Sequence, residues 1–160
     1  QVSLAVTMRT PGNDFELALG FLLSERIVSA PEEVRSIQPC RGAAGDAGLG
    51  DSLRIELAPA VSFEPSRVAR HFAIASSCGM CGKSTLASVR AELPPLPPPL
   101  GPLGIDAIRG APEKLRARQS LFRATGGLHA AGLFDASGEL VLLREDVGRH
   151  NALDKLLGAA

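Results

Sequence analysis

The sequence has no tryptophan or tyrosine, and only three cysteines among its 160 residues. A core must therefore be built from aliphatic side chains and six phenylalanines, and the 45% of apolar residues suffices for one domain or two small ones. Three cysteines, an odd number, do not make the disulfide framework of a small secreted domain. No apolar run reaches the ~18 residues of a membrane span, and no signal-peptide pattern opens the chain. We therefore expect a cytoplasmic protein without a membrane anchor.

Neither sign of charge is in excess, because Lys and Arg together number 17, as do Asp and Glu. Balanced charge gives no global field that would attract nucleic acid or anionic lipid, so we expect neither as a partner. The chain begins at Gln1 without a methionine and stops within an expected helix. We therefore expect a fragment of a longer protein.

The first half of the chain has the local patterns of an α/β protein. Apolar residues alternate with polar or small ones over 2–8, which predicts a strand, and Asn13 with Glu16 predicts a capping box for a helix over 14–25. Further elements are expected from alternation and turn signals. They are strands over 34–38 and 52–58, which pair as a long-looped hairpin, a short helix near 66–72 and a short strand over 72–74.

A proline-rich stretch, Leu93–Gly104, divides the chain, because proline removes backbone donors and fixes φ. It predicts an extended connector; the alternative is a segment that binds an SH3-type domain. Residues 1–92 then form an N-terminal α/β part, 93–111 the connector, and 112–160 a helix–hairpin–helix part.

In the last part, proline and glycine residues mark the ends of the expected helices and strands. Pro112 predicts the first residue of a helix that ends at Gly126-Gly127. A hairpin follows, with strands over 128–134 and from Leu140 onward and a turn at 135–138. After Gly148 the spacing of apolar residues predicts a final helix.

Cys78 and Cys81 lie in the stretch Ser76–Ser84, SSCGMCGKS, which points to a reactive thiol. A thiol attacks only as its thiolate, and an unperturbed cysteine with a pKa of ~8.5 is only slightly ionised at neutral pH. Lys83 and the backbone N–H groups freed by the glycines could stabilise the thiolate. The short strand before the loop would place both thiols at the end of a sheet strand.

Four interpretations of this loop are open. A structural zinc site would need a second pair of ligands, but the sequence has no second C-x-x-C and no suitable histidine spacing. A thioredoxin-type dithiol normally lies at the start of a βαβ unit, but here the C-x-x-C is soon followed by a proline-rich stretch. A nucleophilic or sulfur-carrying cysteine fits the flanking residues best, and two inert buried cysteines are the fourth possibility. Cys40, far upstream, is interpreted as incidental.

A second polar cluster surrounds Asp146. With Glu145, Arg149 and His150 it predicts either a helix cap, in which Asp146 accepts backbone N–H groups and Arg149 pairs with a carboxylate, or the wall of a polar pocket. His129, preceded by Gly126-Gly127, is either a core histidine whose ring nitrogens are hydrogen-bonded or a residue that lines a pocket.

A cytidine-deaminase zinc site would need a glutamate two residues after its histidine, with that histidine motif before the C-x-x-C. Here Ala131 takes that place, and the order of the two motifs is reversed. Deamination is therefore disfavoured.

Three motifs together resemble the FdhD family of formate dehydrogenase accessory sulfurtransferases. They are SSCGMCGK at 76–83, TGGLHAA at 125–131 and REDVGRHNALDK at 144–155, and the stretch from MRTPG at 8–12 to LALGFL at 17–22 is also similar. The resemblance covers nearly the whole chain. Members of the family are longer than this sequence.

The resemblance implies a sulfur relay. Cys78 matches the persulfide cysteine and Cys81 its partner. Sulfur would come from a cysteine desulfurase and pass to the molybdenum bis(molybdopterin guanine dinucleotide) cofactor of formate dehydrogenase, which is cargo, with no metal of the protein's own.

The implied fold is an incomplete cytidine-deaminase-like α/β/α three-layer sandwich with a mixed sheet, and a homodimer is suggested. No cofactor-binding residue is transferred from the family to this chain. A dithiol oxidoreductase, a zinc-binding module and a cofactor-carrying chaperone remain the alternatives.

Overall fold

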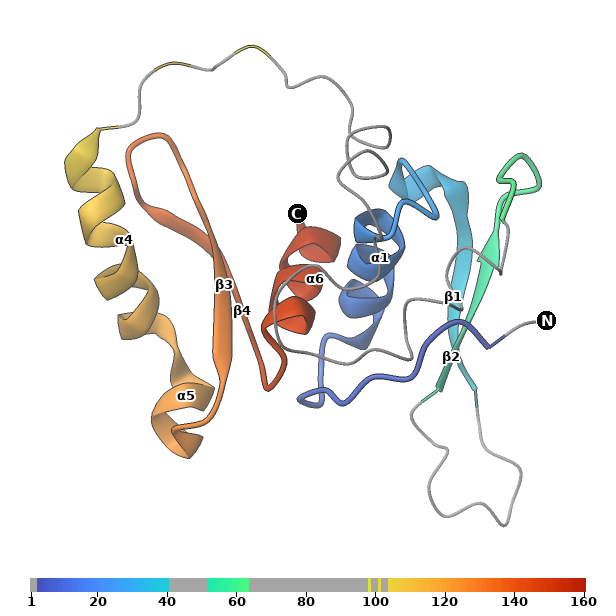
Figure 1. Ribbon diagram of the computed structural model, residues 1–160, viewed down its shortest axis with the longest axis horizontal. Coiled ribbons are helices and arrows are strands. Elements are labelled where there is room, and N and C mark those ends of the chain that lie inside the picture. The colour runs from blue at the N-terminus through green and yellow to red at the C-terminus, as the bar shows by residue number, and fades with distance from the viewer. Residues whose placement is uncertain (1–2, 41–51, 64–97, 99–100, 102–103) are drawn as a thin grey trace, which may run out of the picture. The chain divides into compact units, whose positions relative to one another are not determined.

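The computed structural model of the chain describes residues 3–40, 52–63, 98, 101 and 104–160 (Figure 1). The chain forms two compact units, one of residues 8–62 and 103–160 and the other of residues 1–7 and 63–102. The helices and strands below all belong to the first of these units. The C-x-x-C loop, the expected elements at 66–74 and most of the proline-rich stretch lie outside the described residues.

Helix α1, Asp14–Ser24, confirms the helix expected over 14–25. The capping box is wrong, because Asn13 has a left-handed backbone with φ 59° and its side chain makes no capping hydrogen bond. The carbonyl of Asn13 instead accepts the N–H of Leu17 at 2.9 Å. Asp14 and Glu16 place negative charge in the first turn, where the positive end of the helix dipole favours it.

The expected strand over 2–8 is wrong, because the described part of that segment, Ser3–Met8, forms no strand. The alternating apolar side chains are not buried, with Val6 92% and Met8 87% exposed. Alternation predicts a strand only where a neighbouring strand supplies hydrogen bonds and a covered face.

Strands β1, Val34–Cys40, and β2, Ser52–Leu57, confirm the expected antiparallel hairpin. A single 3-10 turn at Pro31–Glu33 leads into β1. Along β2, half-buried Leu53, Ile55 and Leu57 alternate with exposed polar residues, as expected for a strand with one covered face.

Helix α4, Ile105–Arg118, begins seven residues before the predicted start, and Pro112 lies inside it. The prediction placed this proline at the first helical position, where its missing N–H costs nothing. The structure instead accepts the loss of one hydrogen bond within the helix. The helical region is also split, since Gln119 has an extended ψ of 87° and α5, Ser120–Thr125, starts after it.

The predicted C-terminal hairpin is confirmed as β3, His129–Phe134, paired antiparallel with β4, Leu140–Asp146. Gly126, with φ 71°, ends α5 as the glycine signal predicted. In the turn between the strands, the carboxylate of Asp135 accepts the backbone N–H groups of Ser137 and Glu139, each at 2.9 Å. These bonds close the tip of the hairpin.

Helix α6, Arg149–Ala159, follows β4 and contacts both the β3–β4 hairpin and α1, while α4 also contacts the hairpin. Figure 1 shows the hairpin with α4 on one side and α6 on the other. The buried apolar side chains come from α1, the residues just after it, and α6. They are Leu17, Leu22, Val28, Ala152 and Leu156.

Two glycines let α1 and α6 approach closely. A Cβ on Gly20 would overlap the backbone of Asp154, and one on Gly158 would overlap the backbone of Glu16. Backbone therefore packs against backbone at this crossing, which a larger residue at either position would prevent.

The described part of the chain is a mixed α/β structure with two two-stranded antiparallel sheets. The expected three-layer sandwich requires more strands than these. None of the described helices has the length and apolar character needed to cross a bilayer.

Candidate functional site

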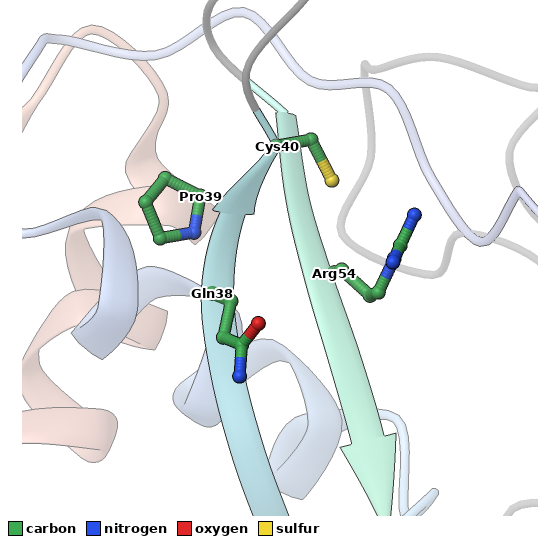
Figure 2. Close-up of a pocket in the computed structure, with 4 residues that line it drawn as sticks. All are labelled: Gln38, Pro39, Cys40 and Arg54. Carbon is green, nitrogen blue, oxygen red and sulfur yellow. The ribbon is translucent and has the colours of Figure 1, made fainter.

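The two cysteines predicted to carry the chemistry, Cys78 and Cys81, lie outside the described residues. Cys40 is described, and it has a free, half-buried thiol at the end of β1. It lines an open pocket of about 190 Å³ together with Gln38, Pro39 and Arg54. Gln38 is the cross-strand partner of Arg54, and the side chains of Cys40 and Arg54 extend to the same side of the hairpin (Figure 2).

The segments that carry the other motifs meet at one end of the β3–β4 hairpin. His129 opens β3 directly opposite Asp146, which ends β4. We call this end the Asp146 corner and define it as residues 8–13, 126–129 and 146–151, with Lys155 beneath them. Loops held at one end of a rigid scaffold are where proteins usually place binding and catalytic groups.

Asp146 is the centre of this corner. Its carboxylate forms an ion pair of 2.7 Å with Lys155, and the two side chains are 0% and 2% exposed. It also accepts the N–H of Gly148 at 2.9 Å and the side-chain amide of Asn151 at 3.1 Å. A buried charge is tolerated only when paired and hydrogen-bonded in this way.

The same groups hold the segment before α1. Asp146 accepts the backbone N–H of Thr10 at 3.0 Å, and Lys155 donates to the carbonyl of Thr10 at 2.8 Å. The Thr10 hydroxyl accepts the N–H of Val147 at 2.9 Å, and the amide of Asn151 donates to the carbonyl of Met8 at 2.8 Å. The MRTPG stretch and the REDVGRHNALDK stretch are thus joined by one polar network.

Glu145, next to Asp146, acts on the other side of the hairpin. Neighbouring residues of a strand point to opposite faces. The buried carboxylate of Glu145 accepts the backbone N–H of Leu121 at 3.0 Å and that of Phe122 at 2.7 Å. It satisfies donors in the first turn of α5 that have no partner within the helix, and so anchors the helix that leads into Gly126-Gly127 and His129.

Two arginine–carboxylate ion pairs surround the start of α1. Arg144 of β4 holds Glu16 through Nε at 2.6 Å and Nη2 at 2.8 Å. Arg9 pairs with Asp14 at an Nε–Oδ1 distance of 2.7 Å, and its Nη2 donates to Asp14 Oδ2 at 2.8 Å, while Oδ1 accepts no hydrogen bond from the described residues. The fork-to-fork Arg144–Glu16 pair fixes orientation as well as charge.

The electrostatics of these carboxylates differ. Hydrogen bonds from the Arg144 guanidinium hold the pKa of Glu16 below its ordinary value. Burial by itself would raise the pKa of Asp146, but the hydrogen bond from Lys155, with those from Gly148 and Asn151, brings it below the ordinary value. Asp146 is therefore held as a carboxylate.

Asp154, on α6 against α1, shows the opposite behaviour. Its carboxylate accepts the hydroxyl of Ser24 at 2.6 Å. Burial raises the pKa of Asp154, and the charge of Glu25 adds to the rise, while the Ser24 hydrogen bond and His150 act against it. A neutral hydroxyl compensates a buried charge less than a cation does.

The structure separates the two interpretations of Asp146. A fully buried side chain cannot line an open pocket, so the pocket-wall interpretation is wrong for this residue. It does accept backbone N–H groups as predicted, but it bonds to Gly148, which is itself the N-cap residue of α6. The exposed titratable side chains of the corner are instead those of His129, Arg149 and His150.

Sequence reasoning missed Lys155 as the partner of Asp146. The available signal was its helical spacing, because Lys155 lies next to buried Leu156 and one turn after the Asn151–Ala152 pair. A lysine on the apolar side of a helix needs a buried acceptor. The anchoring role of Glu145 had no comparable signal, since α5 was not expected as a separate helix.

The described side chains of the corner hold the backbone of the neighbouring segments in place. Among the residues that the structure describes, no group of three or more His, Cys, Asp or Glu side chains is arranged to hold a metal ion. Its carboxylates are engaged with cations or backbone donors, so what it offers is precise placement of three loops.

Comparison with known proteins identifies close relatives. The family model described as FdhD/NarQ family matches residues 1–160. Curated proteins named sulfur carrier protein FdhD are 47% identical over 99% of this chain in Mycolicibacterium paratuberculosis and 45% identical over 98% of it in Streptomyces avermitilis. The chain spans only 59% and 57% of the length of these two relatives.

A solved structure gives the same picture of the fold. A crystal structure described as that of a formate dehydrogenase accessory protein from Desulfotalea psychrophila matches with a TM-score of 0.54 at 24% identity. The match covers 96% of this chain and 48% of that one.

Proposed function

The chain belongs to the FdhD/NarQ family, and on that premise we propose that it is the sulfur-carrying part of a sulfurtransferase that serves formate dehydrogenase. The observation that carries the proposal is 47% identity, over 99% of the chain, to a relative named sulfur carrier protein FdhD. Within the sequence, the Cys78-Gly-Met-Cys81-Gly-Lys83 stretch supplies the group that would hold the sulfur.

The loading step is a sulfur transfer without net oxidation. The Cys78 thiolate attacks the outer sulfur of a persulfide on a cysteine desulfurase. The sulfur–sulfur bond of the donor breaks, its cysteine leaves as a thiolate, and a new sulfur–sulfur bond forms on Cys78. Lys83, two residues after the second thiol, favours the anionic forms at both ends of this step.

The delivery step gives Cys81 a role. Its thiolate attacks Sγ of Cys78 in the persulfide, and hydrosulfide leaves with the electron pair of the sulfur–sulfur bond. A Cys78–Cys81 disulfide remains, and an external dithiol must reduce it before the next cycle. The sulfide acceptor in this proposal is the molybdenum bis(molybdopterin guanine dinucleotide) cofactor, which is cargo.

The remaining expectations are parts of the same proposal. We place the protein in the cytoplasm, where reducing conditions keep a pair of thiols available between cycles. Formate dehydrogenase and a cysteine desulfurase are the protein partners, and two copies of the full-length chain form the working unit. The full-length fold is the deaminase-like sandwich, used without zinc.

The test is mass spectrometry of the full-length protein after incubation with a desulfurase and cysteine. A gain of one sulfur, ~32 Da, on the Cys78 peptide that is lost in Cys78→Ser supports the relay. Cys40→Ser is the matched control, because it removes a thiol outside the C-x-x-C and should leave the adduct in place. Active formate dehydrogenase in cells that contain only Cys78→Ala would refute the relay.

Metal analysis separates the main alternative. One tightly bound zinc per chain, lost in Cys78→Ser, would show a zinc module instead of a carrier.

A further inference from the structure

Helix α4 packs against the β3–β4 hairpin with one side only. On the inner side, a Cβ on Gly132 of β3 would overlap the side chain of Leu115. Four exposed residues of the outer side are spaced four, three and four apart, which places them on one line along the helix. We call this line the α4 stripe, and its residues are Ile105, Arg109, Pro112 and Arg116.

The region of α4 and α5 is basic, although the chain as a whole has no net charge. Residues 105–125 hold five basic side chains and two acidic ones, a net charge of +3. Lys114 is paired with Glu139 at 2.6 Å. The remaining four basic residues have no carboxylate within 4 Å among the residues that the structure describes. These are Arg109, Arg116, Arg118 and Arg123.

Two of these arginines have a structural task. Arg118 donates to the carbonyl of Leu140 at 3.4 Å, and Arg123 donates to that of Ala117 at 2.7 Å. Arg109 and Arg116 make no such bond within the described part of the chain. The helix dipole favours a cation in the last turn, where Arg116 lies, but it gives no reason for Arg109, the fifth residue of the helix.

Apolar side chains accompany these charges on the outer side. Ile105 and Ile108 are 58% and 55% exposed, more than any other large apolar side chain of the described helices. They lie one turn apart at the start of α4, next to Arg109. Protein interfaces are enriched in arginine, and their centres are apolar. The outer side of α4 therefore has the composition of a protein interface.

A nucleic acid or a membrane fits the same residues less well. Single-stranded nucleic acid is bound on exposed aromatic side chains, and Phe122, the one aromatic residue of 105–125, is half-buried. Asp106 and Glu113 are exposed on α4 as well and would repel phosphate groups. A helix that lies on a membrane needs a continuous apolar face, whereas the α4 stripe alternates apolar and charged residues.

We propose that the α4 stripe is a docking surface for an acidic amphipathic helix of a protein partner. Arg109 and Arg116 are two turns apart, about 10 Å along the helix axis. The partner helix therefore carries two carboxylates seven residues apart, with an apolar side chain between them that lies against Pro112. The inference goes beyond the sulfur-carrier function and uses none of its residues.

The test uses the full-length protein, with two synthetic helical peptides in place of the partner. In the first peptide, two glutamates stand seven residues apart with a leucine between them. In the second, of equal net charge, the glutamates stand five residues apart and so lie on different sides of the helix. Titration followed by NMR measures both affinities and locates the binding on the backbone amides of the protein.

The first peptide shifts amides of α4 and α5. The second binds about threefold more weakly, because only one of its carboxylates can reach an arginine. Arg109→Glu/Arg116→Glu weakens binding of the first peptide about tenfold, the change that two exposed ion pairs typically support, and added salt weakens it as well. A peptide with lysines in place of both glutamates restores binding to this variant.

Arg26→Glu is the matched control. It reverses the charge of another exposed arginine that has no carboxylate of the described residues within 4 Å, and it leaves the affinity for the first peptide unchanged. Arg109→Gln/Arg116→Gln, which removes the two charges without reversing them, weakens binding in the same direction. This second variant keeps the test valid if circular dichroism shows that the charge reversal unfolds the protein.

Three results would overturn the proposal. The first peptide could bind no more tightly than the second. A short single-stranded RNA or vesicles of phosphatidylglycerol could bind through α4 more tightly than the first peptide, which would show a partner of another class. Finally, Arg109 and Arg116 could resist modification by phenylglyoxal in the full-length protein alone, which would show that the rest of the chain or a second copy already covers the stripe.

Discussion

Lys155 and Asp146 lie 2.7 Å apart in an ion pair that is sealed from solvent. The pair joins the end of β4 to the second half of α6, and its hydrogen bonds reach back to the segment before α1. The two side chains therefore hold together β4, α6 and the segment before α1, and their contribution to the free energy of unfolding can be measured.

Lys155→Met should lower the free energy of unfolding by about 3–5 kcal/mol, because it leaves the Asp146 carboxylate buried without a cation. Denaturant unfolding followed by circular dichroism measures the loss. Wild-type stability should also fall on acidification, because a carboxyl whose folded pKa is lowered contributes stability above its unfolded pKa that is lost as the pH falls through the folded pKa. A Lys155→Met protein as stable as wild type at neutral pH would contradict this account.

Asp154→Asn should stabilise the protein at neutral pH. Burial raises the folded pKa of Asp154, so its contribution is fully present below the unfolded pKa and is lost as the pH rises through the folded pKa. The asparagine variant has no such loss. The difference between variant and wild type should therefore grow from acid to neutral pH in chemical denaturation, and a difference independent of pH would argue against it.

Gly20→Ala should destabilise the protein by about 1–3 kcal/mol, because the added Cβ would overlap the Asp154 backbone and push α1 away from α6. Gly110→Ala is the matched control within α4, since nothing lies within 4 Å of its new Cβ. There the change should stabilise by about 0.5–1 kcal/mol, the usual gain from removing a helical glycine. Thermal unfolding of both variants gives the comparison, and equal effects would be inconsistent with close helix packing.

Glu145→Ala should loosen α5, because the N–H groups of Leu121 and Phe122 lose their acceptor. The cost should be about 1–3 kcal/mol, while Glu145→Gln, which keeps one acceptor oxygen, should cost less. Hydrogen exchange of the α5 amides provides a local measurement. Protection that is unchanged in Glu145→Ala would show that the carboxylate does not anchor the helix.

The sequence predicted the elements whose signals are local. Both hairpins, α1 and α6 follow from periodicity and turn residues, and Gly126 marked its helix end correctly. The failures involve partners distant in the sequence. Ser3–Met8 alternates like a strand but is not paired as one, and α4 runs through Pro112 although the residue is a typical helix start.

The candidate site divides in the same way. One of the two interpretations of Asp146, a carboxylate that accepts backbone N–H groups before the last helix, came from a local pattern, whereas its burial was not predicted. Helical spacing places Lys155 on the buried side of α6, but its pairing with Asp146 and the hydrogen bonds to Thr10 depend on tertiary packing. Cys78 and Cys81 remain a prediction from the motif and the family.

Glu145 and Asp146 are adjacent on β4 yet serve opposite faces of the hairpin. A slip of β4 by one residue against β3 would turn Glu145 toward Lys155 and Asp146 toward α5. Asp146 would then sit one methylene short of the amides that Glu145 now reaches, while Glu145 would have to fit its longer side chain where Asp146 now contacts Lys155. A hairpin slipped by one residue would keep the same charge on each face but put a side chain of the wrong length there, so the order Glu145-Asp146 favours the observed register.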